Sequence, residues 1–108
     1  MEKNDEILVA FCTVDQDDKA KEIASTIIQN RLAACVNIIP NIQSIYWWKG
    51  KIQNEGELLM VIKTTRDCFD ALDHLLKKIH PYEVHELIAW QPDRTSEVYE
   101  DWILSEVE

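Results

Sequence analysis

The feature that constrains this chain most is a pair of long strand-like runs with a single turn signal between them. The runs, Ala33–Trp48 and Lys51–Lys63, are rich in Ile, Val, Tyr, Trp and Thr, and Lys49-Gly50 separates them. These residue types favour strands joined as a β-hairpin. At roughly 3.3 Å per residue each arm would extend about 40–50 Å, whereas a chain of this length has a radius of gyration of only about 13 Å. The tip of the hairpin is therefore predicted to leave the globule.

The predicted tip carries the apolar and aromatic side chains Ile45, Tyr46, Trp47 and Trp48. An exposed ribbon of this kind aggregates unless another surface covers it. Another copy of the same chain is the simplest cover, because most oligomers are built from identical subunits. We therefore predict a homo-oligomer and assign Ile45, Trp47 and Trp48 to its interface, where large aromatic residues commonly act as anchors rather than as a cofactor site.

The composition fits one ordinary globular domain that spans residues 1–108. The chain is 46% hydrophobic and 29% charged and has no Pro/Gly/Ser-rich linker. No run approaches the roughly 18 apolar residues of a membrane span, and the first six residues are polar and acidic, unlike a signal peptide. Three cysteines without a CxxC pair make a disulfide framework improbable. We expect a cytoplasmic protein with reduced thiols and no membrane association.

The charge balance argues against nucleic acid as a partner. Eleven basic and twenty acidic residues give a formal net charge of −9. A chain with this charge repels phosphate backbones and anionic lipid surfaces. The same field attracts cations, although acidic surfaces also serve solubility and do not by themselves name a metal.

The order of predicted elements indicates the fold. Apolar and amphipathic patterns predict a central strand at Ile7–Val14 and then a helix that ends near Arg31. The hairpin follows, with a bulge at Pro40. After it we expect a second helix that ends before Pro81, a strand at residues 86–91 and a third helix. Asp15 or Asp17 is expected to cap the first helix. The apolar face of the third helix is expected to consist of Val98, Tyr99, Trp102 and Ile103. The order βαββαβ followed by a helix predicts an α+β, ferredoxin-like antiparallel sheet. The hairpin's first arm would be an edge strand.

Several enzyme classes lack their sequence signatures here. With only Gly50 and Gly56, the chain cannot form a glycine-rich phosphate-binding loop, and no serine has a GxSxG context. An acyl-phosphate hydrolase on the same fold would need an arginine in a glycine-rich loop after the first strand, which residues 13–17 do not provide.

The remaining candidates for chemistry are scattered polar and sulfur-containing side chains. Each also has a purely structural interpretation: Cys12 is typical of a buried strand, and His80 is placed to interact with the end of the second helix. Cysteine thiolate and imidazole together suit copper or zinc. The full set is Cys12, His80, Tyr82, Glu83, His85, Glu86 and, in the hairpin, Tyr46, Glu57 and Lys63.

Four sequence blocks in the same order resemble the CutA family of divalent-cation tolerance proteins: RLAACVNIIP, SIYWWKGKI, ELLMVIKTT and HPYEVHE. The resemblance runs from about Ile7 to Trp102. It implies a ferredoxin-like protomer that forms a tight trimer through its long strands, similar to the architecture of PII signalling proteins. It also implies tolerance to copper and other divalent cations, without a known enzymatic reaction.

The resemblance also implies a metal site. Some members bind copper through a cysteine at the end of the first strand and a histidine before the HPY proline, which here are Cys12 and His80. Ile79 occupies a position where some members have another histidine, and His85 replaces the usual proline. His85 and Glu86 are therefore further candidate ligands for copper or another divalent cation.

A second hypothesis treats the chain as a PII-like signalling module. Such a module would bind a small anion or metabolite in the clefts between subunits. Residues assigned to this inter-subunit cleft are Tyr46, Glu57, Lys63, Tyr82 and Glu83.

Overall fold

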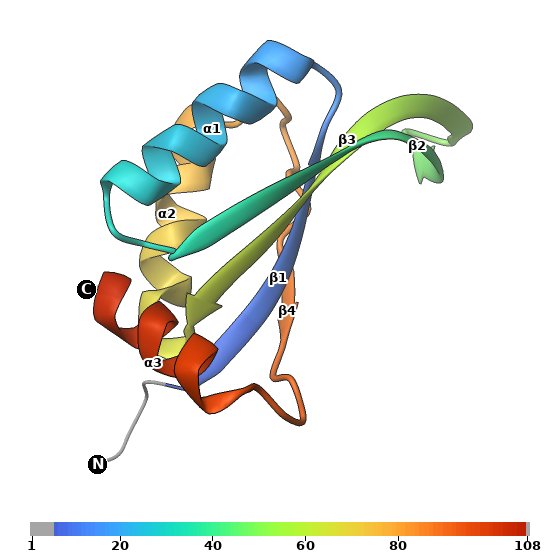
Figure 1. Cartoon of the computed structure of the whole chain (residues 1–108). Coiled ribbons are helices and arrows are strands. Elements are labelled where there is room, and N and C mark those ends of the chain that lie inside the picture. The colour runs from blue at the N-terminus through green and yellow to red at the C-terminus, as the bar shows by residue number, and fades with distance from the viewer. Residues whose placement is uncertain (1–5, 108) are drawn as a thin grey trace.

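The fold is a four-stranded antiparallel sheet with helices on one face, as the computed structural model of residues 6–107 shows (Figure 1). The strand order is β2-β3-β1-β4. Its elements are β1 (Ile7–Val14), α1 (Asp17–Gln29), β2 (Cys35–Trp48), β3 (Lys51–Thr65), a 3₁₀ turn (Arg66–Cys68), α2 (Phe69–Ile79), β4 (Ile88–Trp90) and α3 (Glu97–Glu106). This is the predicted α+β, ferredoxin-like arrangement, with β1 and β3 in the centre and β2 at an edge.

The core lies between the sheet and the helices α1 and α2. Side chains alternate along β1, so that Ala10, Cys12 and Val14 all face this layer and are fully buried. Their neighbours on β3 alternate in the same way, because Cys12 pairs with Met60 and Ala10 with Ile62. The helices contribute one apolar stripe each, which is centred on Ile23 and Ile27 in α1 and on Leu72 and Leu76 in α2.

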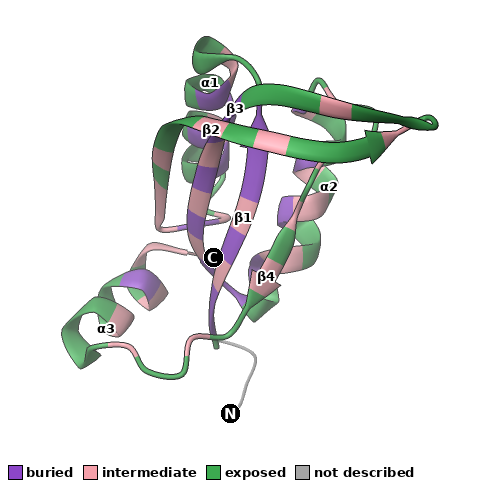
Figure 2. Cartoon of the chain, turned by 90° about the vertical axis from the view of Figure 1, so that its right-hand side faces the viewer, coloured by how far each residue is buried: buried purple, intermediate pink, exposed green. Residues whose placement is uncertain are grey.

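The opposite face of the sheet has no cover within residues 6–107. Figure 2 looks onto this face, and both α1 and α2 lie behind the strands. The alternation that buries Ala10 and Cys12 turns Phe11 outward, beside Val61 of β3 and Ile88 of β4. Phe11 also makes an edge-to-face contact with Trp90 at 4.7 Å between ring centroids. We call this surface, which comprises Phe11, Val61, Ile88 and Trp90, the open face.

The hairpin of β2 and β3 extends beyond the helices, as predicted (Figure 1). It gives the protomer an elongated shape of 46 × 27 × 22 Å. The predicted bulge is confirmed: the register shifts between Ile39 and Ile42, so that Pro40 and Asn41 together face the single residue Leu58. Proline has no amide hydrogen for the ladder, and Asn41 adopts a left-handed φ of 64°. The bulge therefore separates the sheet part of β2 from the tip.

The tip is exposed in the protomer. Trp47 pairs with Ile52 across the hairpin, and their exposed fractions are 71% and 63%. Ile45 is 69% exposed, and Tyr46 is also exposed, whereas Trp48 is half-buried. Lys49 and Gly50 both have positive φ, as a tight two-residue turn requires.

The helices differ from the sequence-based expectations in their details. The N-cap of α1 is Gln16, and its side chain makes no capping hydrogen bond, so the predicted aspartate cap is wrong. The acidic side chains of Asp17 and Asp18 instead lie in the first turn, where their negative charges interact favourably with the positive end of the helix dipole. The longest helix has 13 residues, and none within residues 6–107 is long and apolar enough to cross a membrane.

Helix α3 buries less than its sequence predicted. Only Ile103 is fully buried, whereas Val98 is 82% exposed, and Tyr99 and Trp102 stack on each other with their rings partly in solvent. The predicted inward face is therefore wrong for three of its four members. The end of α3 is held by Arg31, which donates from Nη1 to the Glu106 carboxylate at 2.9 Å and to the Glu106 carbonyl at 3.1 Å.

The core description predicts the effect of a cavity in α2. Leu76→Ala should lower the free energy of unfolding by about 2–5 kcal/mol, because it removes a fully buried side chain from a packed layer. Urea unfolding at one fixed protein concentration measures this loss. Val98→Ala on the exposed side of α3 is the control and should change the value by no more than about 0.5 kcal/mol. A loss below about 1 kcal/mol for Leu76→Ala would contradict the described packing.

Candidate functional site

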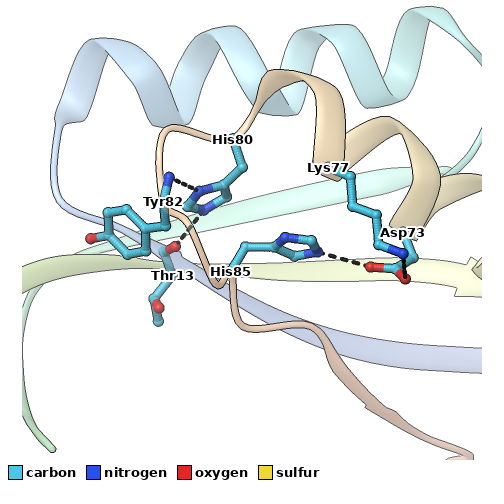
Figure 3. A network of polar contacts seen from close by, with 6 residues as sticks. All are labelled: Thr13, Asp73, Lys77, His80, Tyr82 and His85. Carbon is cyan, nitrogen blue, oxygen red and sulfur yellow. Dashed lines mark hydrogen bonds and ion pairs between the residues drawn. The ribbon is translucent and has the colours of Figure 1, made fainter. Parts of the chain in front are cut away.

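The site begins where proline ends helix α2. A residue before proline is driven away from the helical region, and His80, which precedes Pro81, has φ −77° and ψ 136°. Its backbone N–H still completes the helix by donating to the Leu76 carbonyl at 2.8 Å. The turn out of the helix points the imidazole ring of His80 toward the end of β1, where Thr13 lies (Figure 3).

Both ring nitrogens of His80 are occupied by the chain itself. The backbone N–H of Tyr82 donates to Nδ1 at 3.1 Å, so the proton lies on Nε2, which donates to the Thr13 carbonyl at 2.8 Å. The ring is therefore held as one neutral tautomer. Burial lowers the pKa of His80, although the hydrogen bond to Thr13 and the charges of Asp15 and Glu57 oppose this shift.

Cys12 lies one residue before Thr13 and faces the core. Its side chain has no exposed surface. Burial, together with the negative charges of Glu86 and Glu57, raises the pKa of the Cys12 thiol to about 12. The thiol is thus protonated at neutral pH, but two carboxylates lie close enough to act on it.

His85 points to a carboxylate of α2, that of Asp73. Its Nε2 lies 2.8 Å from Oδ1 of Asp73, and Lys77 approaches the other oxygen of Asp73 at 3.8 Å (Figure 3). The ring of His85 also stacks on His80, with centroids 5.6 Å apart. The histidine that replaces the family proline therefore ties the segment after α2 to the helix itself.

A pocket of about 690 Å³ lies between the hairpin and this segment. Four of the five predicted cleft residues line it, together with the three predicted interface residues and Glu86. The hairpin supplies Ser44, Ile45, Tyr46, Trp47, Trp48, Glu55 and Glu57, β1 supplies Thr13, and the segment after α2 supplies Tyr82, Glu83, Val84 and Glu86.

Lys63 does not join this pocket in the protomer. It pairs with Val9 and Cys35 in the sheet, and its ammonium group donates to Oδ1 of Asn37. Its place is thus in the sheet part of β3, on the far side of the bulge from the pocket. Among the described residues 6–107, no lysine, arginine or histidine lines the pocket.

A hydrogen bond between Tyr82 and Glu57 connects the two sides of the pocket. The Tyr82 hydroxyl donates to Oε2 of Glu57 at 2.5 Å, which joins the segment after α2 to β3. Burial raises the pKa of Tyr82, and the bond to Glu57 and its charge raise it further, so the hydroxyl keeps its proton. Glu57 is itself only 6% exposed.

The protomer has no ready-made metal site. Within residues 6–107, no group of three or more His, Cys, Asp or Glu side chains is arranged to hold a metal ion. The charges of Glu57 and Glu86 nevertheless act on the thiol of Cys12. His80 binds the carbonyl of Thr13, which is the next residue along β1. A cation at this end of β1 would need His80 to turn from Thr13, or further ligands from a second subunit.

Sequence reasoning missed two contributors to the site. Glu55 lies two residues before Glu57 and pairs with Ser44, so the alternation of strand residues places both carboxylates on one side of β3. That period-two spacing was a usable signal. Asp73, in contrast, meets His85 only through the path of the chain after α2, which no local spacing predicts.

The fold and the pocket define a ferredoxin-like α+β protein whose long hairpin encloses an acidic pocket. A family model described as "CutA1 divalent ion tolerance protein" matches residues 8–106. The chain belongs to this family of CutA1 divalent ion tolerance proteins.

Similar proteins come from bacteria, plants and animals. The chain is 40% identical over 95 residues to the divalent-cation tolerance protein CutA of Thermus thermophilus, covering 88% of this chain and 92% of that one. It is 45% identical over 97 residues to protein CutA of Mus musculus, covering 90% of this chain but 55% of that one. The chain thus spans about half the length of its mammalian relatives.

Solved structures of the family have the same fold. The crystal structure of CutA1 from Oryza sativa matches with a TM-score of 0.93 at 38% identity and covers 97% of this chain and 96% of that one. The Thermus thermophilus protein matches with a TM-score of 0.91 at 37% identity and covers 94% and 99%.

The environment of His80 predicts a contribution to pH-dependent stability. Its folded-state pKa lies below the ordinary value, so as the pH falls the unfolded chain binds the proton first. The stability that the neutral ring contributes is present above its ordinary pKa of about 6.5 and is lost on acidification below that value. Between pH 7 and 5, His80→Asn should therefore lose less unfolding free energy than the wild type.

Urea titrations in EDTA at several pH values measure this difference. His74→Asn is the matched control, because His74 is an exposed histidine on the same helix. It should follow the wild-type pH profile. Identical profiles for the wild type and His80→Asn would show that His80 titrates alike in the folded and unfolded states.

Proposed function

We propose that this protein is a homotrimeric divalent-cation tolerance protein that acts by binding Cu(II) or a similar ion rather than by catalysis. The observation that carries the proposal is a pocket lined by the carboxylates of Glu57 and Glu86 and, among residues 6–107, by no basic side chain. The thiol of Cys12 is buried in the core one residue before Thr13 of the pocket wall, and the charges of both carboxylates act on it. The name of the family supports a role in tolerance to divalent ions. We place this role in the cytoplasm, where the three thiols would stay reduced.

The trimer is proposed from the surface that the protomer leaves uncovered. Trp90 and Ile88 on the open face, and Ile45 and Trp47 at the tip, are all at least 44% exposed. Large apolar patches of this kind mark interaction sites, and three copies related by a three-fold axis would close on themselves. Trp47 and Trp48 would then be interface anchors, with Ile45 beside them.

The cation is proposed to bind at the end of β1, with Cys12 and His80 as ligands. A bound cation would oppose the burial and the carboxylate charges that now raise the pKa of the Cys12 thiol, so that Cys12 releases its proton and becomes a soft ligand. His80 would exchange its bond to the Thr13 carbonyl for the ion. Glu86 supplies negative charge from the pocket wall, and His85, which already bonds Asp73, is the further candidate.

The PII-like hypothesis also finds support in the pocket, but not for an anionic ligand. Tyr46, Glu57, Tyr82 and Glu83 line one cavity, as a ligand site requires. The four glutamates that line it would repel a phosphate or carboxylate. A signalling role would therefore need a neutral or cationic ligand.

Assembly is tested by light scattering coupled to size exclusion. At micromolar concentration the protein should have about three times its chain mass of 12.6 kDa. Ile45→Asp or Trp48→Asp should dissociate or unfold the trimer, because an unpaired charge in an interface core costs several kcal/mol. Val98→Asp places the same charge on the exposed side of α3 and should leave the mass unchanged. A monomeric wild type would refute the proposed trimer.

Metal binding is tested by anaerobic titration with Cu(II). Cys12→Ser and His80→Ala should each weaken binding about tenfold or more, because a hydroxyl is a poorer donor than a thiolate and alanine donates nothing. Binding should also weaken below about pH 6, where protons compete for imidazole.

Cys35→Ser is the control for adventitious copper binding by a thiol. Cys35 is a half-exposed cysteine at the start of β2 and lies outside the pocket, so its loss should leave the affinity unchanged. Unchanged affinity in both Cys12→Ser and His80→Ala would move the site elsewhere, for example to His85 and Glu86.

A further inference from the structure

The pocket is far larger than a single metal ion requires. Its volume of about 690 Å³ lies within the range of about 300–1,000 Å³ that is typical of sites for small organic molecules. One water molecule, by comparison, occupies about 30 Å³ in the liquid. The end of β1 forms only one corner of this cavity, through Thr13, while the hairpin supplies most of the wall.

The charged residues that line the pocket favour a positively charged ligand. Glu55, Glu57, Glu83 and Glu86 line the pocket, and no basic side chain does. Lys49 approaches Glu83 at 3.9 Å, but both side chains are largely exposed, so this pair is screened by solvent. Glu55, Glu57 and Glu86 have no ion-pair partner among residues 6–107.

Among these carboxylates, that of Glu57 is buried and has only one hydrogen bond from the described residues. It is 6% exposed, and the Tyr82 hydroxyl bonds only to Oε2. Its Oε1 has no hydrogen-bond partner among residues 6–107. A carboxylate oxygen on a residue with so little exposed surface is stabilised by a donor, and the described part of the chain supplies one only to Oε2. A ligand with an N–H donor and a positive charge would satisfy it.

The aromatic residues of the wall suit the apolar part of such a ligand. Tyr46 and Tyr82, which lie outside the proposed interface anchors, line the same pocket. Aromatic faces attract ammonium groups and pack against methylene chains. A hydrated metal ion would leave these faces without a partner.

We propose that this pocket binds a small organic polyammonium ion, with one ammonium group at Oε1 of Glu57 and its aliphatic stem along the aromatic wall. The carboxylates of Glu55 and Glu86 bind further ammonium groups. The site shares Glu57 and Glu86 with the proposed metal role, but it does not require Cys12 or His80 as ligands. The protein would thereby respond to an organic cation as well as to a divalent ion.

Isothermal titration with spermidine tests the proposal at an ionic strength near 0.15 M. The wild type should bind one spermidine per protomer with saturable heat. Glu57→Gln keeps the size and the acceptor for Tyr82 but removes the charge, and it should weaken binding about tenfold or more. Glu97→Gln removes the same charge from an exposed position on α3 and should leave the affinity unchanged.

A second variant tests the aromatic wall without touching the buried carboxylate. Tyr46→Leu keeps an apolar side chain but removes the ring, and it should weaken spermidine binding about threefold to tenfold. Circular dichroism and light scattering establish that each variant keeps its fold and assembly. Titration with Mg²⁺ at the same charge concentration separates specific binding from attraction by the overall negative charge, and Mg²⁺ should displace spermidine poorly.

Three outcomes would overturn the inference: no saturable heat with spermidine, equal weakening by Glu57→Gln and Glu97→Gln, or displacement by Mg²⁺ as effective as by excess spermidine. Cys12→Ser distinguishes this inference from the metal proposal. That variant should lose copper affinity and keep spermidine affinity. Loss of spermidine binding in a folded Cys12→Ser trimer would mean that the ligand depends on the metal site, which contradicts an independent organic-cation site.

Discussion

The long antiparallel pairing of β2 with β3 is the constraint on which the rest of this structure depends. The register continues from Cys35 and Lys63 in the sheet to Trp48 and Lys51 at the tip, with one interruption at the Pro40 bulge. The helices cover only the first part, so the pairing carries an apolar ribbon into solvent. That ribbon creates both the surface proposed for assembly and one wall of the pocket.

The second wall of the pocket is the segment after α2, and its position depends on the proline that ends this helix. Pro81 ends the helix, and His80 then anchors the following segment to β1 through the Thr13 carbonyl. The Tyr82 hydroxyl fastens the same segment to Glu57 on β3. Two hydrogen bonds thus hold an acidic, aromatic pocket between elements that are distant in the sequence.

Much of the fold was predictable from the sequence, because periodicity and turn chemistry are local. The hairpin, the bulge at Pro40 and the central position of β1 follow from residue patterns, and the structure confirms them. The capping residue of α1 was not predictable, because Gln16 occupies the N-cap position and its side chain makes no capping hydrogen bond. Tyr46, Glu57, Tyr82 and Glu83, which the sequence assigned to a cleft between subunits together with Lys63, line one pocket within a single chain, and Lys63 does not. The contact of His85 with Asp73 was not predictable, because it depends on tertiary geometry.

Amide hydrogen exchange, resolved by residue with NMR, tests most directly whether copies of this chain cover the hairpin. In an isolated protomer, the amides of β2 that face away from β3 have no strand partner and exchange rapidly. If the tip is buried between subunits, these amides from Ile42 to Trp48 should be strongly protected at micromolar concentration. Exchange at the rate of a solvent-exposed edge strand would contradict the account, because the apolar hairpin would then remain uncovered in solution.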